Sequence, residues 1–163
     1  DFETMLIKTN IKKTKNLEHT NFHQPVSFSI FSNVPGHNIK PVHVVNNDPK
    51  LLIDIFVQEL KNISMAAYKI QKLKYKYVYD KIKDKQLFKK FDKWVREIPV
   101  IGFNSSRYDA NIIKKYLYDS IKNYDMPDDK QVQVLKTGNM YRVITSKHLK
   151  FLDISNFLAP GTS

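Results

Sequence analysis

Apolar and polar residues alternate in two early stretches of the chain. Residues 1–9, "DFETMLIKT", and residues 24–32, "QPVSFSIFS", both show a period of two, which indicates strands with one buried face. The polar stretch between them, residues 10–23, is predicted to be a loop. After a turn at Pro35-Gly36, residues 41–45, "PVHVV", predict a third short strand.

The hydrophobic period changes after residue 48. Asp48 is a suitable N-cap, and Pro49 suits the first helical position. Apolar residues then recur at steps of three or four, at Leu52, Phe56, Leu60, Ile63, Ala67 and Ile70. This spacing predicts a long amphipathic helix.

Lysines and tyrosines interleave between residues 74 and 97, where Tyr75, Tyr77 and Tyr79 stand at alternate positions. The favoured interpretation is a solvent-exposed, charged helix whose tyrosines lie on the side that packs against the rest of the protein. The alternative is a lysine-rich aromatic surface that binds a DNA strand.

The second half of the chain returns to strands. Residues 98–104, "IPVIGFN", predict a buried strand, and residues 108–124 have the apolar spacing of a helix. Residues 131–158 predict two or three strands, with turns near Gly138-Asn139 and Ser146-Lys147. Strands, helix, strand, helix and further strands predict an α/β or α+β layer structure.

Length and composition limit the possibilities. The 163 residues are enough for one domain with a core, and no stretch approaches the roughly 20 apolar residues of a membrane span. We expect a soluble, intracellular protein, with the cytoplasm, nucleus and an organelle all open as compartments. The absence of cysteine excludes disulfides and thiolate zinc sites, and the five histidines show no metal-ligand spacing.

The formal charge of +11 favours a polyanionic partner, most often nucleic acid. Arginine occurs only at positions 96, 107 and 142, so the charge is nearly all lysine. Part of it could reflect the codon usage of an AT-rich genome. Because arginine forks are scarce, the composition favours non-specific attraction to phosphates over sequence readout.

Three acids have suggestive positions. Asp1 and Glu3 are two residues apart on the first predicted strand, and Asp109 lies where a strand gives way to a helix. Asp109 could simply interact with the positive end of the helix dipole. Carboxylates gathered together would instead need cations, and two divalent ions about 3.5–4 Å apart can hydrolyse a phosphodiester.

These motifs resemble those of a known enzyme family. "DFET" followed by "GFNSSRYD" is similar to the first two exonuclease motifs of family B DNA polymerases, Asp-x-Glu and Asn-x(2 or 3)-Phe/Tyr-Asp. The closing "NMYRVITSKHLKFLDISNFLAPGTS" resembles the next segment of the protein-primed branch found in viruses, linear plasmids and self-synthesising transposons. The resemblance implies a ribonuclease H-like 3′→5′ exonuclease fold, in which helices flank a central mixed sheet, and one such domain over residues 1–163.

The resemblance also assigns roles to residues. The catalytic carboxylates, which would ligate two Mg²⁺ or Mn²⁺ ions, are Asp1, Glu3 and Asp109. The residues that would hold a single-stranded 3′ end are Thr4, Asn104 and Tyr108. The implied partners are that 3′ end, primer-template DNA, the rest of the polymerase chain and a terminal priming protein, with no membrane.

The chain departs from the family pattern in several places. Many relatives have His-Asn where this chain has Phe103-Asn104, and a Ser/Thr-Leu pair is replaced by Ile154-Ser155. The third exonuclease motif, Tyr-x3-Asp, is missing and is expected downstream of residue 163. We therefore expect a fragment of a longer polymerase, incomplete at both ends. Asp153 matches a structural position of the family and is not expected to be a ligand.

Three functions follow from these observations. The leading one is proofreading: the 3′→5′ exonuclease portion of a protein-primed DNA polymerase, acting in DNA replication. The second is a catalytically incomplete or decayed remnant that binds single-stranded DNA without cutting it. The third is a lysine-rich interaction protein whose motifs arose by chance.

Overall fold

The strands of the protein form two sheets in a mixed α/β arrangement. The computed structural model describes residues 1–14, 17–36, 40–102, 105–106, 108–125 and 132–158. The first sheet is antiparallel, in the order β1 (Phe2–Thr14), β2 (Leu17–Ile30) and β3 (Val42–Val45). The second is mixed, in the order β4 (Ile98–Gly102), β7 (Leu149–Asp153), β6 (Met140–Thr145) and β5 (Gln133–Thr137), with β4 parallel to β7.

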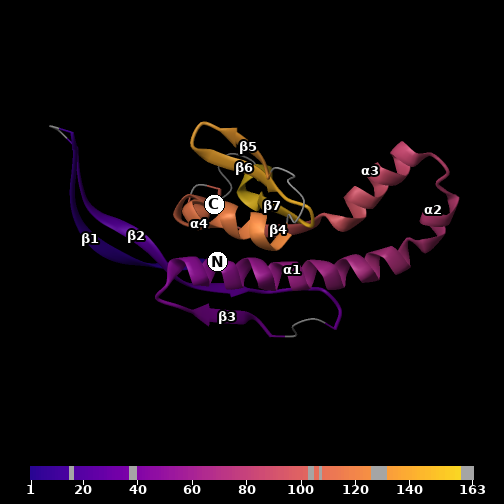
Figure 1. Ribbon diagram of the computed structural model, residues 1–163, viewed down its shortest axis with the longest axis horizontal. Helices are drawn as coiled ribbons and strands as arrows, with labels where there is room; N and C mark the ends of the chain where they lie inside the picture. The colour runs from indigo at the N-terminus through magenta and orange to yellow at the C-terminus, as the bar shows by residue number, and fades with distance from the viewer. Residues whose placement is uncertain (15–16, 37–39, 103–104, 107, 126–131, 159–163) are drawn as a thin grey trace.

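Within the described residues, four α-helices and a short 3₁₀ helix accompany the sheets. They are α1 (Pro49–Lys74), α2 (Lys76–Lys81), α3 (Lys85–Arg96), α4 (Asp109–Asp125) and η1 (Ile154–Phe157). Helix α1 contacts β2 on one side and α4, β4 and β7 on the other, whereas α2 and α3 extend away from both sheets (Figure 1). None of the described helices is long and apolar enough to cross a membrane.

The core lies between α1 and the sheets. Phe56 of α1 packs edge-on against Phe2 and Phe28, with ring centroids 4.8 and 5.2 Å apart. The predicted start of this helix is confirmed, since the Asp48 carboxylate accepts hydrogen bonds from the amides of Lys50 and Leu51. Its buried apolar residues are Leu52, Ile53, Phe56, Val57, Leu60, Ile63 and Ala67. The predicted amphipathic helix is therefore confirmed as far as Ala67, whereas Ile70, which was predicted on the same apolar face, is exposed.

The loop predicted for residues 10–23 is wrong, because β1 and β2 continue through most of this stretch as a long hairpin (Figure 1). The register pairs Ile11 with His19 and Lys12 with Glu18. Main-chain hydrogen bonds hold such a ladder together whatever its side chains are. A polar sequence without alternation therefore does not exclude a strand.

Strand β4 was predicted to be buried, and it is only half-buried. It lies at the edge of its sheet, and Ile101 is exposed on one face. Strand β1 is also an edge strand, of the other sheet. Within the described residues, the strands that carry or precede the two motifs therefore belong to separate sheets.

A buried carboxylate fixes the end of α4. Asp125 accepts a hydrogen bond from the His148 amide (3.0 Å) and another from the Ser146 hydroxyl, and it contacts Nδ1 of His148 at 2.6 Å. Burial would raise the pKa of Asp125, but these hydrogen bonds and the His148 charge lower it below its usual value. The end of α4 is thereby tied to the turn that precedes β7.

Candidate functional site

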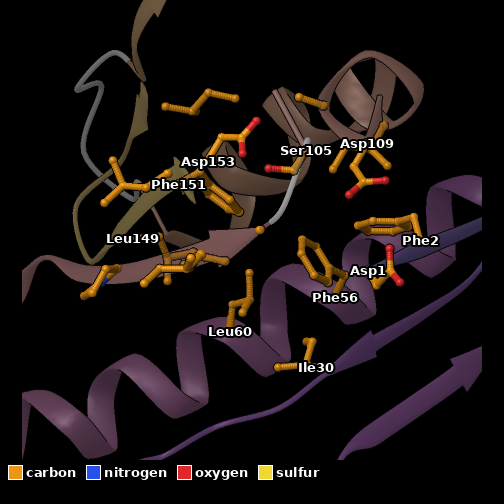
Figure 2. A pocket seen from close by; sticks show the side chains of 18 of the residues that line it. Asp1, Phe2, Ile30, Phe56, Leu60, Ser105, Asp109, Leu149, Phe151 and Asp153 are labelled. Atoms are coloured by element: carbon orange, nitrogen blue, oxygen red, sulfur yellow. The ribbon is translucent and has the colours of Figure 1, made fainter. Parts of the chain in front are cut away.

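A cavity of about 480 Å³ lies between the two edge strands (Figure 2). Residues of β1, β2, α1, β4, β7 and α4 line it, and most of its walls are apolar, among them Phe56 and Leu60. Three carboxylic acids also line it: Asp1, Asp109 and Asp153. Two of them belong to the sequence motifs, and the third ends β7.

The first motif is held by strand pairing. The amide oxygen of Asp1 accepts a hydrogen bond from the Ser29 amide (2.9 Å), and the amino group of Asp1 donates to Ser29 O (3.0 Å). Phe2 is buried in the core between the two exposed acids Asp1 and Glu3. Asp1 lines the cavity, whereas Glu3 does not.

Asp109 is the first residue of α4 and is half-buried. Its pKa is raised, first by burial and then by the negative charges of Asp153 and Glu3. A helix N-terminus alone would favour the ionised form. Burial and the neighbouring carboxylates therefore outweigh the helix dipole in setting the pKa of Asp109. A cation beside Asp109 would stabilise its ionised form against both effects.

Asp153 uses both of its oxygens within the protein. One accepts from the Ser106 amide (2.9 Å), and the other accepts from the amide (2.9 Å) and hydroxyl (2.7 Å) of Ser155. The side chain is only 2% exposed, yet the hydrogen bonds lower its pKa against the effect of burial. Asp153 thus holds the segment between β4 and α4, which agrees with the structural role expected from the sequence.

The turn after β4 also requires a small residue. A Cβ atom at Gly102 would lie 2.6 Å from the Ser105 hydroxyl, too close for any real contact. The Ser105 carbonyl in turn accepts from the Ala110 amide (2.8 Å) in the first turn of α4. Position 102 therefore has no room for a side chain beside Ser105.

Residues of the two motifs meet beside the acids. The Thr4 hydroxyl lies 3.4 Å from the Tyr108 hydroxyl and 3.0 Å from Nδ1 of His23. The rings of His23 and Tyr108 are edge-on, with centroids 6.0 Å apart. Thr4 and Tyr108 are far apart in sequence, and the fold brings them into one polar cluster.

Sequence reasoning missed His23, because it lies in the stretch predicted as a loop. The signal that could have found it is strand register: His23 pairs with Leu6, two residues beyond Thr4 on the opposite strand. His23 supplies an imidazole near the second motif from another strand.

The predicted site residues are not all gathered. Phe103 and Asn104 lie outside the described residues. Among the described residues, those of this site included, no three His, Asp or Glu side chains are close enough to share a metal ion. The oxygen donors Asp1 and Asp109 suit a hard divalent cation, but Glu3 contributes only through its charge.

The chain was compared with known proteins. No protein-family model, no curated protein and no solved structure gives a significant match. The polymerase resemblance therefore rests on the sequence motifs alone.

Proposed function

We propose that this chain is the 3′→5′ proofreading exonuclease portion of a protein-primed family B DNA polymerase. The substrate would be the single-stranded 3′ end of DNA, and the reaction would be hydrolysis of its terminal phosphodiester bond. The observation that carries the proposal is the meeting of the two motifs. Thr4 of the first motif contacts Tyr108 of the second, and the charge of Glu3 acts on Asp109.

The proposal includes a ribonuclease H-like arrangement of the strands. The order of elements supports it: an antiparallel meander bearing the first motif, a long helix, a strand leading to the second motif, and another helix. Strands β1 and β4 are both edge strands, and residues of both line the same cavity. Joining these two edges would turn the two sheets into one central mixed sheet.

Asp1, Glu3 and Asp109 would hold two Mg²⁺ or Mn²⁺ ions. When bound, such ions supply an activated water and stabilise the leaving oxygen. Tyr108 is exposed and would stack on or contact the terminal base whatever its identity. Thr4, held between His23 and Tyr108, would orient that ring and the strand end.

One observation favours the second candidate, a DNA-binding remnant that does not cut. Glu3 is exposed and does not line the cavity, and the described acids form no three-membered metal group. In an active enzyme Glu3 would have to approach Asp109 when the cations bind. A remnant would bind the DNA end without this step.

The two candidates are separated by a digestion assay on 5′-labelled single-stranded DNA with Mg²⁺ or Mn²⁺. If the proofreading function is correct, we expect the protein to shorten the strand one nucleotide at a time from the 3′ end. The variant Glu3→Gln should abolish the ladder. A matched control is Asp119→Asn, which removes an exposed acid from α4 and should leave activity unchanged.

Because the described acids form no three-membered metal group, the 163-residue chain should digest the strand very slowly or not at all. If the protein binds the strand but leaves it intact, the remnant is the correct function. If the 163-residue chain digests it rapidly with metal, the ligand set proposed here is incomplete, and another acid must join Asp1 and Asp109.

A further inference from the structure

A second feature of the molecule lies far from the cavity. Residues 69–97 form the end of α1, all of α2 and α3, and the turn after α3, and we call this segment the basic arm. It extends away from both sheets (Figure 1). Ten lysines and Arg96 stand against four acids, so the arm carries a net charge of +7 out of +11 for the chain.

Most acids of the arm are occupied by internal contacts. Asp92 accepts from the hydroxyls of Tyr68 (2.7 Å) and Tyr79 (3.1 Å), and Asp84 caps α3. Glu97 pairs with Lys93, the one arm lysine with an acidic partner within 4 Å among the described residues. All ten lysines are exposed. The acids thus stabilise the arm, and the lysine charges remain available to an outside anion.

The arm also exposes aromatic rings. Five rings form a contiguous cluster in which neighbouring centroids lie 5.1–6.0 Å apart: Tyr75, Tyr79, Phe88, Phe91 and Trp94. Trp94 at one edge of the cluster is 60% exposed, and Tyr77 outside it is 72% exposed. The Lys81 ammonium lies over one face of the Tyr77 ring, 5.3 Å from its centroid. A base stacked on the opposite face would therefore have a cation nearby for a phosphate.

We propose that the basic arm binds single-stranded nucleic acid. Its lysines would attract the phosphates, and its exposed rings would stack on bases. Paired bases inside a duplex offer no free face, so the aromatic contacts favour a single strand. Lysines lack the rigid fork of arginine, so binding should be insensitive to sequence. This inference does not rest on the proposed nuclease function, because the arm is separate from the acids of the cavity.

The chain offers an internal reporter, since Trp94 is its only tryptophan. We expect an oligo(dT) strand to quench Trp94 fluorescence saturably in buffer with EDTA, where no metal-dependent step can occur. Affinity should fall with salt by a log–log slope of about 0.7 per phosphate contact. Circular single-stranded DNA has no 3′ end and should quench equally, while duplex DNA and heparin should quench far less.

Tyr77 provides a clean test of stacking, because no other ring is in contact with it among the described residues. The variant Tyr77→Ala should weaken oligo(dT) binding by about 5-fold to 150-fold, the equivalent of roughly 1–3 kcal/mol for one stacked base. The matched control is Tyr118→Ala, which removes an exposed tyrosine of α4 and should have no effect. Circular dichroism melting of both variants checks that the fold is kept.

Paired lysines test the phosphate contacts. The double variant Lys89→Gln/Lys90→Gln on α3 should reduce the salt slope by about 1.4 if both residues contact phosphates. The matched control, Lys114→Gln/Lys115→Gln, changes two adjacent exposed lysines of α4 and should leave the slope unchanged. Equal salt slopes for both double variants would mean that the lysines attract DNA only through the net charge of the protein, and that α3 offers no specific binding surface.

The proposal fails if oligo(dT) does not quench Trp94, or if heparin and duplex DNA quench it as well as the single strand does. It also fails if light scattering detects a dimer that Tyr77→Ala dissociates, since the exposed rings would then bind a second copy of the chain. If the protein quenches normally but produces no digestion ladder, the nuclease function is wrong and binding by the basic arm is supported. If it produces the ladder but shows no quenching, binding by the basic arm is wrong and the nuclease function is supported.

Discussion

Replacing Asp153 by asparagine tests the anchor between β7 and the start of α4. The carboxylate accepts hydrogen bonds from the amides of Ser106 and Ser155 and from the Ser155 hydroxyl. In Asp153→Asn one oxygen becomes an amide NH₂ that faces an N–H donor, so a buried charged hydrogen bond is lost. Such a loss costs roughly 1.5–3 kcal/mol. For a chain of this size it lowers the melting temperature by about 5–10 °C.

The effect depends on pH in a defined direction. The folded pKa of Asp153 is lowered from its usual value, and an unfolded aspartate titrates near pH 3.9. Its stabilising contribution is therefore complete above about pH 4 and is lost as the pH falls through the folded pKa. Asparagine does not titrate, so the difference in the free energy of unfolding between the unmodified protein and Asp153→Asn should become smaller below pH 4.

The assay is urea unfolding at pH 7 and pH 3, followed by far-UV circular dichroism. Asp119→Asn removes an exposed acid of α4 and should change stability little at either pH. If Asp153→Asn is as stable as the unmodified protein at pH 7, the carboxylate does not anchor the loop. A stability difference that widens in acid would contradict the direction of the pKa shift.

Three further predictions concern the site. Mg²⁺ or Mn²⁺ should raise the melting temperature, because binding to the folded state stabilises it; Asp1→Ala with Asp109→Ala should remove the rise, and an equal rise in both proteins would exclude this metal site. Tyr108→Ala should weaken binding of a single-stranded 3′ end by roughly 1–3 kcal/mol, measured by fluorescence anisotropy of a labelled strand, and unchanged affinity would exclude a base contact. Gly102→Ala should lower the melting temperature, because its Cβ would lie 2.6 Å from the Ser105 hydroxyl, and an unchanged melt would mean that the turn adapts freely.

The sequence predicted those elements whose buried face repeats. Helix α1 begins at Pro49 behind its Asp48 cap, and α4 buries Ile113, Leu117 and Ile121, as the apolar spacing predicts. The turn at Gly138 has the positive φ of 57° that favours glycine. These signals are local, and they depend on the residues within one or two turns.

Contacts between distant segments were harder to predict. The hairpin through residues 10–23 depends on pairing between two strands, and β4 depends on its place at the sheet edge. The motifs identified Asp109 and Tyr108, but the contact of Tyr108 with Thr4 and His23 depends on the register between β1 and β2. Which distant strands and side chains pair with each other is a property of the tertiary structure, and no pattern of neighbouring residues predicts it.

Asp125 and Asp153, two of the three buried aspartates of the described residues, connect β7 to both ends of α4. Asp125 joins the end of the helix to the start of the strand, and Asp153 joins the end of the strand to the segment before the helix. Helix α4 is about 25 Å long and rigid. A displacement at the Asp125 contacts should therefore be transmitted to the segment that Asp153 holds. Amide protons of α4 and β7 should then exchange with solvent in one cooperative opening. Removing the hydrogen bonds of the Asp125 carboxylate would therefore disturb Asp109 at the opposite end of the helix.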